Sequence, residues 1–340
     1  MTKDLKDKTQ NELEEIAIGL GGQKYLGGYI FRFIHALGVN DINKITPLGK
    51  AFRSRLAEGG YFISQLKIIA RQSEPDGTTK YLFELYDDNR IEAVFLPGRS
   101  RQTVCISTQV GCSMNCLFCA TAKIKFKRNL TAAEILDQTN SIAQDTGRRI
   151  TSIVYMGMGE PLSNFEAVLK AVRILNHPDG KNIGIRHQTI STCGDACGIR
   201  RLAEESIRPR LAISLNAPSD SLRAKLMPIN NKYPIPELMR AVSFYQAKTR
   251  MRVTFEYVLI KGVNDSTLHA QMLTKLVKGL RCNVNLIEYN PHTGCELSAS
   301  SPQVIKRFAA VLEKSGIETS IRFKMGQKIK AGCGQLGADL

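Results

Sequence analysis

The chain of 340 residues has no tryptophan, and only 7% of its residues are aromatic. It also has no apolar run near the roughly 20 residues that a membrane-spanning helix needs. The segment MTKDLKDKTQNELEEIAIGL at its start mixes lysines with carboxylates, a composition unlike that of a signal or transit peptide. We therefore expect a cytoplasmic protein without a membrane segment.

Carboxylates are scarce relative to basic residues. Asp and Glu number 31 against 47 for Lys and Arg, which gives a formal net charge of +16. This excess favours a polyanionic partner such as nucleic acid, because cationic side chains displace counterions from phosphates. A basic enzyme with small substrates is the alternative. Two stretches concentrate the positive charge beside cysteines, KIKFKRN (123–129) and IRFKMGQKIKAGCGQL (321–336).

The nine cysteines show no regular pairing, and a reducing cytosol favours metal binding or catalysis over disulfides. Cys112, Cys116 and Cys119 follow the spacing C-x3-C-x2-C, with no fourth cysteine nearby. Thiolates hold iron–sulfur clusters, and three of them leave one iron of a four-iron cluster open. The amine and carboxylate of S-adenosylmethionine can chelate that iron, which predicts radical chemistry. The alternative is a zinc site completed by a histidine or by Cys193, although we interpret Cys193 and Cys197 as structural.

Changes in hydrophobic period divide the chain into three predicted parts. Residues 1–60 show short helical patterns, and residues 61–100 alternate as in a small antiparallel sheet or hairpin. From residue 101 to 340, strands alternate with helices, which predicts an α/β fold with a parallel sheet and right-handed crossovers. Six or seven such units should form a partial barrel with ligands at the carboxyl ends of its strands. The predicted strands are 103–109, 150–157, 187–194, 210–216, 253–260, 283–290 and 319–325.

The predicted helices carry ordinary start signals. In LTAAEILDQTNSIAQ (130–144), Thr131 precedes the apolar pattern and Glu134 follows three residues later, which is a capping box. Before the barrel, helical patterns occur at 7–20, 27–37 and 47–60.

Together, the motifs resemble those of the radical RNA adenine methyltransferases, the RlmN/Cfr family of radical S-adenosylmethionine enzymes. The resemblance covers nearly the whole chain and includes Phe118, the aromatic residue before the last cysteine of the triplet. It implies a (βα)6-type radical S-adenosylmethionine barrel, a [4Fe-4S] cluster on the three cysteines, and RNA binding by residues 1–60. The stretches that carry it are CISTQVGCSMNCLFCATAK, YMGMGEPLSN, TISTCG, LAISLNAPSD, LMPINNKYPI, VTFEYVLIKGVND, VNLIEYNP and AGCGQL.

The resemblance also implies which residues bind S-adenosylmethionine. Gly159 and Glu160 would hold its amino group, and a carboxylate against an ammonium is physically sensible. Asn216 stands where many relatives have histidine. The other implied contacts are Ser191, Ser214, Leu215 and Asn290, at or near the ends of predicted strands.

The mechanism implied by the resemblance uses two molecules of S-adenosylmethionine per turnover. Cys333 first accepts a methyl group by displacement. A radical made from the second molecule then removes hydrogen from that S-methyl group, and the methylene adds to the adenine ring. Cys105 resolves the resulting enzyme–RNA adduct by proton removal and a disulfide with Cys333. Glu92 matches a position treated as a general base, although an exposed edge-strand glutamate is the plain alternative.

The implied product is 2-methyladenosine in 23S ribosomal RNA, with transfer RNA left open as a second substrate. Methylation at carbon 8, which would confer antibiotic resistance, is the nearest alternative; a glycyl-radical activase and a zinc RNA-binding module are more distant ones. A flavodoxin would donate electrons, and we expect a monomer. The sequence departs from the family pattern at Lys328, Lys330 and Gly332, where relatives tend to have acidic residues and alanine.

Overall fold

The computed structural model describes residues 3–292, 295–322 and 326–338. Its centre is a ten-stranded sheet in the order β1-β2-β3-β4-β7-β8-β9-β10-β11-β12. A separate two-stranded sheet pairs β5 with β6. The strands are β1 (Lys67–Ser73), β2 (Thr79–Glu84), β3 (Arg90–Pro97), β4 (Gln102–Cys105), β5 (Gln109–Val110), β6 (Arg128–Asn129), β7 (Ser152–Tyr155), β8 (Gln188–Thr192), β9 (Arg210–Ser214), β10 (Val253–Leu259), β11 (Cys282–Glu288) and β12 (Thr319–Arg322).

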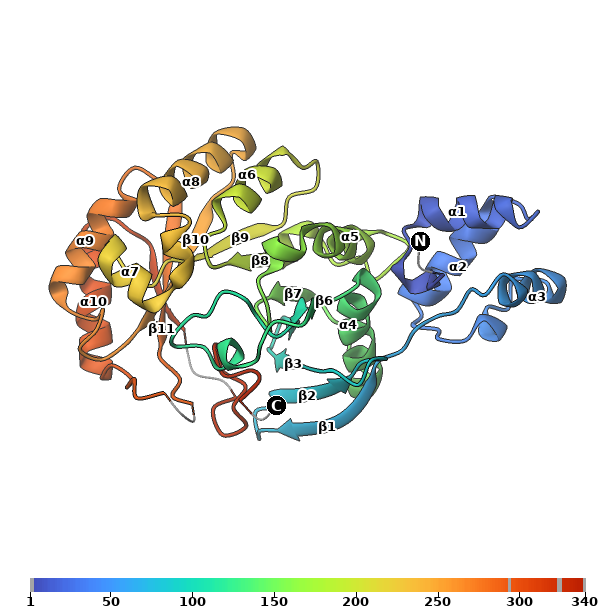
Figure 1. Cartoon of the computed structure of the whole chain (residues 1–340), viewed down its shortest axis with the longest axis horizontal. Coiled ribbons are helices and arrows are strands. Elements are labelled where there is room, and N and C mark those ends of the chain that lie inside the picture. The colour runs from blue at the N-terminus through green and yellow to red at the C-terminus, as the bar shows by residue number, and fades with distance from the viewer. Residues whose placement is uncertain (1–2, 293–294, 323–325, 339–340) are drawn as a thin grey trace.

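Strands β4 and β7 to β12 are parallel and form the predicted partial barrel. Helices that follow these strands pack outside the curved sheet (Figure 1). Each predicted strand from residue 103 onward is present, and residues 323–325 of the last one lie outside the described residues. The helices are α1 (Gln10–Gly19), α2 (Tyr25–His35), α3 (Lys50–Glu58), α4 (Ala132–Thr146), α5 (Phe165–Asn176), α6 (Ala196–Glu204), α7 (Asp220–Leu226), α8 (Ile235–Thr249), α9 (Thr267–Val277) and α10 (Pro302–Lys314).

The predicted antiparallel extension is confirmed, and it continues the barrel sheet. β1, β2 and β3 pair antiparallel, and β3 pairs antiparallel with β4, with Val94 opposite Cys105. The sheet therefore crosses residue 100, where the sequence predicted a boundary; the divisions at residues 60 and 100 stay predictions. The capping box at the start of α4 is also present, with Thr131 and Glu134 bonded reciprocally.

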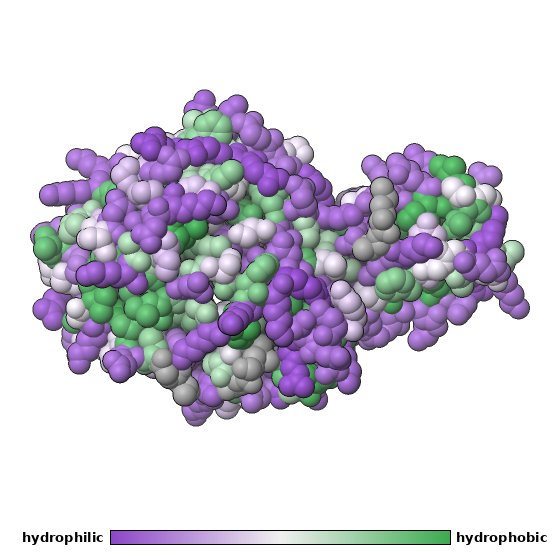
Figure 2. All heavy atoms as spheres, in the orientation of Figure 1, coloured by the Kyte–Doolittle hydropathy of each residue, from purple (hydrophilic) through white to green (hydrophobic). Residues whose placement is uncertain are grey.

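The N-terminal helices form a lobe beside the barrel, and hydrophilic residues cover most of the visible face (Figure 2). Within the described ranges, we find no helix with the length and apolar character needed to cross a membrane.

A buried ion pair joins the N-terminal lobe to the barrel. Lys6 and Asp137 are 2% and 3% exposed, and the Lys6 ammonium contacts the Asp137 carboxylate and the Ser64 carbonyl oxygen. The other Asp137 oxygen accepts a hydrogen bond from the Leu66 amide at 2.6 Å. The lobe is thus fixed to α4 by a charged contact from which water is excluded.

Asp137→Ala should destabilise the protein by about 3–5 kcal/mol, because it leaves the Lys6 charge buried and unpaired. Urea denaturation followed by circular dichroism would measure the loss. Arg173→Ala is the matched control: it breaks the exposed Arg173–Glu205 pair and should cost less than about 1 kcal/mol. Equal losses in the two variants would contradict the expectation.

Candidate active site

The three cysteines of the C-x3-C-x2-C motif lie on one loop, residues 111–127. The loop is closed at its base by the pairing of β5 with β6, in which Val110 lies opposite Arg128. Gly111 begins it with a φ of +74°, and a Cβ there would lie 2.3 Å from the Lys125 carbonyl oxygen. Only glycine fits this crossing of the two loop ends.

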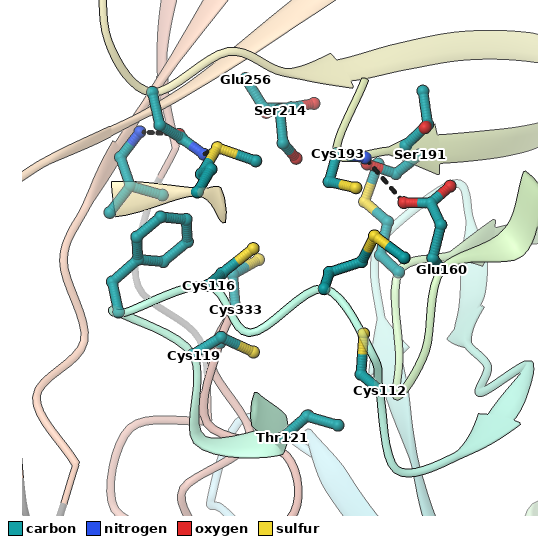
Figure 3. Close-up of a pocket in the computed structure, with 18 of the residues that line it drawn as sticks. Cys112, Cys116, Cys119, Thr121, Glu160, Ser191, Cys193, Ser214, Glu256 and Cys333 are labelled. Carbon is teal, nitrogen blue, oxygen red and sulfur yellow. Dashed lines mark hydrogen bonds between the residues drawn. The ribbon is translucent and has the colours of Figure 1, made fainter. Parts of the chain in front are cut away.

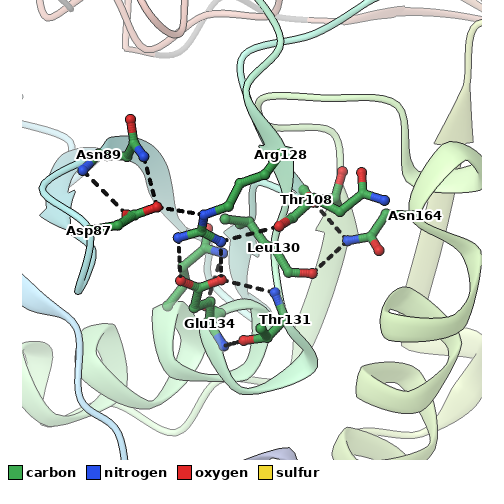
Figure 4. Close-up of polar contacts among 10 residues, drawn as sticks. Asp87, Asn89, Thr108, Arg128, Leu130, Thr131, Glu134 and Asn164 are labelled. Atoms are coloured by element: carbon green, nitrogen blue, oxygen red, sulfur yellow. Dashed lines mark hydrogen bonds and ion pairs between the residues drawn. The ribbon is translucent and has the colours of Figure 1, made fainter. Parts of the chain in front are cut away.

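Arg128 anchors the far end of this cluster loop (Figure 4). Its guanidinium donates two hydrogen bonds of 2.8 Å to Glu134 and one of 2.7 Å to Asp87. The hydrogen bond from Arg128 outweighs partial burial and lowers the pKa of Asp87 far below its usual range. Asn164 adds a second brace by donating to the carbonyl oxygens of Thr108 and Leu130.

The cluster loop faces a pocket at the carboxyl ends of the barrel strands, where the sequence predicted the ligands. The pocket encloses about 1040 Å³, including the space open to solvent at its mouth. Figure 3 shows the three cysteines on one side, with Cys333 beside Cys116 and Cys119, and Glu160, Ser191 and Cys193 on another. These residues come from four separate segments of the sequence and meet in one cavity.

The electrostatics of the triplet fit a group that brings positive charge. Burial raises the pKa of Cys112 to about 12, and burial followed by the charges of Cys119, Cys112 and Glu160 raises the pKa of Cys116 well above its ordinary value. Thiolates at these positions need a cation to stabilise them, and iron supplies it when it binds sulfur. The donor set thus fits an iron–sulfur cluster.

Gly159, in a left-handed conformation, and the buried carboxylate of Glu160 line another side of the pocket. Gly159 has a φ of +98°, and a Cβ there would lie 2.5 Å from the Gln109 side chain. The Glu160 amide donates to that side chain at 2.8 Å, and the Glu160 carboxylate accepts from the amides of Cys193 at 2.7 Å and Leu162 at 3.1 Å. Burial raises the pKa of Glu160 despite these bonds. The carboxylate is therefore held in place and poised for a cationic partner.

Glu160→Gln should weaken binding of S-adenosylmethionine by roughly 10-fold to 150-fold, the range expected from about 1.5–3 kcal/mol for a hydrogen bond to a charged group. Equilibrium dialysis with the reconstituted protein would measure the dissociation constant. Glu166→Gln on α5 removes an exposed carboxylate outside the pocket and should leave it unchanged. Unaltered affinity of Glu160→Gln, with normal iron content, would contradict this role.

The predicted cofactor contacts separate into two groups. Ser191, Ser214 and Asn216 line the pocket. The amide of Asn216 also supports its own left-handed turn, since its oxygen accepts from the Val258 amide at 2.9 Å. Leu215 is fully buried behind this turn, and Asn290 lies beside the C-terminal loop; neither is among the described lining residues.

The C-terminal loop, residues 326–338, carries Cys333 to the pocket. The side-chain amide of Asn290 donates to the Cys333 carbonyl oxygen at 3.2 Å. The backbone amide of Ala120 donates to the Gly334 carbonyl oxygen at 2.7 Å. Thr121 donates to the Leu336 carbonyl at 2.7 Å. The loop is therefore bonded directly to the segment that follows Cys119.

The unusual residues of this loop lie at its start. The Lys328 amide donates to Glu74 at 2.7 Å, and Lys330 adopts a φ of +52°. A Cβ on Gly332 would lie 2.7 Å from the Asn290 amide nitrogen, so the alanine common in relatives would require Asn290 to shift.

Cys105 is the last residue of β4 and lies near Cys333. Burial, and after it the nearby charge of Cys333, raise the pKa of Cys105 to about 12. Glu92 lies two residues from Val94, the partner of Cys105, and so shares its face of the sheet. It is only 2% exposed: its carboxylate pairs with Lys80 at 3.2 Å and accepts from the Gly337 amide at 2.7 Å. The alternative of an exposed edge glutamate is wrong.

Cys193, Glu256 and Arg322 are three of the lining residues to which the sequence assigned no site role. Cys193, interpreted as structural, faces the pocket beside Glu160. Glu256 lies near Cys333, and Arg322 pairs with Glu256 at 3.3 Å. The position of Cys193 two residues after Ser191 was a usable signal, because alternate residues of a strand share a face. Nothing local marked Glu256 or Arg322.

Comparisons with known proteins identify the family to which this chain belongs. The model of the Radical SAM superfamily matches residues 106–272, and that of the ribosomal RNA large subunit methyltransferase N-terminal domain matches residues 3–61. A probable dual-specificity RNA methyltransferase RlmN from Thermoanaerobacter is 45% identical over 98% of this chain and 97% of its own. The chain belongs to the RlmN family.

Other RlmN proteins agree over the full length. The dual-specificity RNA methyltransferase RlmN of Syntrophobacter fumaroxidans is 43% identical over 98% of both chains. The crystal structure of a radical SAM methyltransferase from Sphaerobacter thermophilus superimposes with a TM-score of 0.94 at 42% identity, covering 98% of this chain and 99% of that one. Membership of the RlmN family identifies a radical S-adenosylmethionine RNA methyltransferase and implies a [4Fe-4S] cluster and S-adenosylmethionine. The zinc module and the glycyl-radical activase are thereby set aside.

Proposed function

We propose that the protein forms 2-methyladenosine in 23S ribosomal RNA, and that transfer RNA is its second substrate. The observation that carries the proposal is that Cys333, from the C-terminal loop, lines one pocket with the three cluster cysteines, while Cys105 lies near enough to be affected by the charge of Cys333. The relatives are named RlmN dual-specificity methyltransferases, which favours carbon 2 over carbon 8. The N-terminal lobe would contribute to RNA binding. A flavodoxin would donate the electrons, and the protein would act as a monomer.

The proposed residue roles follow from the pocket. Cys112, Cys116 and Cys119 would hold the cluster, and Glu160 with Gly159 would hold the amino group of S-adenosylmethionine. Ser191, Ser214 and Asn216 would contact the rest of that cofactor. Leu215 would shape the turn that carries Asn216, and Asn290 would contact the cofactor from the end of β11. The bound cofactors supply one methyl group and, from a second S-adenosylmethionine, a radical that removes hydrogen.

Two thiols and one carboxylate would perform the protein's part of the reaction. Cys333 accepts the methyl group on its sulfur and carries it to the adenine ring, which links the protein covalently to RNA. The Cys105 thiolate would take the proton from the ring carbon that received the methylene group and pass it to Glu92, and the adduct would give up one electron to the bound cluster. Cys105 would then attack the Cys333 sulfur to form a disulfide. The bond between that sulfur and the methylene carbon breaks with its electron pair left on the carbon, which takes up a proton and becomes the methyl group. Glu92 is the proposed proton acceptor, supported by its burial on the same sheet face as Cys105.

Nucleoside mass spectrometry tests the function. The reconstituted protein, S-adenosylmethionine and a reductant would be incubated with unmodified 23S RNA, which is then digested. Appearance of 2-methyladenosine supports the proposal. Formation of 8-methyladenosine, or of neither product despite cofactor cleavage, would refute it.

Methylation of Cys333 should accelerate as pH rises. Cys333 is exposed as a residue, but desolvation of its sulfur in the pocket, and then the charge of the Glu256 carboxylate, raise its pKa above the ordinary value. Only the thiolate is nucleophilic, so the rate should rise about tenfold per unit between roughly pH 7 and pH 9. Single-turnover assays without RNA, read by the mass of the Cys333 peptide, would show it. Glu256→Gln should raise the rate at neutral pH, and a flat profile for the unaltered protein would contradict the argument.

A further inference from the structure

A second cavity lies at the amino ends of the barrel strands and contains four arginines. We call it the basic cup, and define it by Arg101, Arg186, Arg210 and Arg322. Arg101 precedes β4, Arg186 lies just before β8 in the 3-10 helix Ile185–His187, and Arg210 begins β9. The cup encloses about 910 Å³, including the space open to solvent, and no carboxylate is among its described lining residues.

The charges of the cup are largely uncompensated. Within the described ranges, the guanidinium groups of Arg101, Arg186 and Arg210 make no ion pair or hydrogen bond. Other arginines, such as Arg128, Arg173 and Arg200, are each paired with a carboxylate. Arg322 is the exception, since it pairs with Glu256 at 3.3 Å. Three exposed guanidinium groups around one cavity repel one another, and an anion would relieve this repulsion.

A row of residues on neighbouring strands joins the basic cup to Cys105, the thiol that the proposed reaction uses. Cys105 is in register with Val154, Val154 with Thr189, and Thr189 with Arg210. Residues in register on adjacent strands point to the same face, so this row runs along the inner face of the barrel from Cys105 to Arg210. Three strand spacings separate its ends, roughly 14 Å along the sheet.

Arg322 connects the cup with the pocket at the opposite end of the barrel. Its side chain lines both cavities, and the pocket side holds Cys333 and Glu256. The carboxyl side of the barrel is occupied by the cluster loop and the C-terminal loop, which are bonded to each other through Ala120 and Gly334. The amino side therefore offers the RNA a basic route to Cys105 and Cys333.

We propose that the basic cup binds RNA phosphates that flank the target adenosine, so that the base enters the barrel from the amino ends of its strands. Arginine suits this task because its planar fork can donate two parallel hydrogen bonds to a phosphate. Hydroxyl groups of Thr103 and Thr189 in the same wall can donate further hydrogen bonds. The inference rests on the proposed RNA substrate and adds the place where its backbone binds.

The test is a binding assay that requires no catalysis. A fluorescent, unmodified 23S RNA hairpin carrying a single-stranded adenosine is titrated with the full-length protein, and anisotropy is measured at several salt concentrations. The variant combines Arg101→Gln, Arg186→Gln and Arg210→Gln. Loss of three phosphate contacts should reduce the slope of log K against log salt by about two units and weaken binding by about 50-fold near 0.15 M salt.

A matched control removes the same charge elsewhere. Lys306, Arg307 and Lys314 lie on or at the end of α10, on the outer surface of the barrel, and their change to glutamine should leave the slope within about half a unit. The three arginines changed to lysine keep the charge and should keep the salt slope. Thermal melting checks that each variant is folded.

The outcomes separate the inference from the function. Equal RNA affinity of the glutamine variant and the unaltered protein overturns the inference, whether or not methyladenosine is formed. The inference is equally overturned if RNA binding is intact but turnover fails with flavodoxin and not with dithionite, because the cup would then serve the electron donor. If the cup variant alone loses RNA affinity while the unaltered protein makes no methyladenosine, the inference stands and the proposed reaction fails.

Discussion

Replacing Cys105 with alanine is expected to leave RNA covalently attached to Cys333 and to reduce release of methylated RNA by roughly 100-fold to 10,000-fold, the range for loss of a positioned proton-transfer group. Cys105 lies close enough to Cys333 for the charge of Cys333 to raise the pKa of Cys105, and its side chain is partly buried. No other cysteine shares the inner face of β4. A denaturing gel with labelled RNA would show the adduct as a band of higher mass.

Two further variants make this result specific. The double variant Cys105→Ala, Cys333→Ala should form no adduct, because the sulfur that carries the methylene is gone. Cys282→Ala removes a partly buried thiol at the start of β11, outside the pocket, and should behave as the unaltered protein does. Adduct in the double variant, or normal turnover of Cys105→Ala, would disprove the role of the two thiols.

Changing any one of Cys112, Cys116 and Cys119 to alanine should abolish product and most of the bound iron. In the proposed site each thiolate would hold a different iron of the cluster, so the loss of one would leave two thiolates for four irons. Anaerobic reconstitution followed by iron and sulfide analysis and visible absorption would measure the cluster. Product formation should fall below detection because the proposed radical step requires the cluster.

Cys197→Ala is the matched control for these three variants. Cys197 is an exposed thiol on α6 and does not line the pocket. It should retain full iron content and activity. A triplet variant that keeps four irons per chain would show that its cysteine is not a ligand, and an iron-poor Cys197→Ala would show that iron content reports general damage.

Local patterns predicted the fold well, because the determinants were local. The apolar strands and the Thr131–Glu134 capping box each depend on residues a few positions apart, and all appear as expected. The spacing of the cysteine triplet likewise requires only one loop. The continuity of β3 with β4 across residue 100 was missed, since strand pairing is not visible in hydrophobic period alone.

The remainder of the site depends on contacts between distant segments. Glu256 and Arg322 are 66 positions apart and meet only because β10, β11 and β12 are adjacent. Asn290 and Leu215, expected from the resemblance at the cofactor, also have structural contacts that the sequence did not show: Asn290 holds the C-terminal loop, and Leu215 is buried behind a turn. Burial of Glu92 was equally hidden, because Lys80 reaches it only across the β2–β3 pairing and Gly337 lies 245 positions away in the sequence.

The attachment of the C-terminal loop affects when the protein can become active during synthesis. Leu336 is bonded to Thr121, and Gly337 to Glu92, across separations of 215 and 245 residues. While residues 333–337 are still inside a ribosome's exit tunnel, neither bond can form and Cys333 cannot reach the pocket. The barrel strands and the cluster loop, which precede these residues, can fold before then. Activity therefore begins only after residues 333–337 have left the tunnel, which keeps shorter nascent chains from starting the reaction.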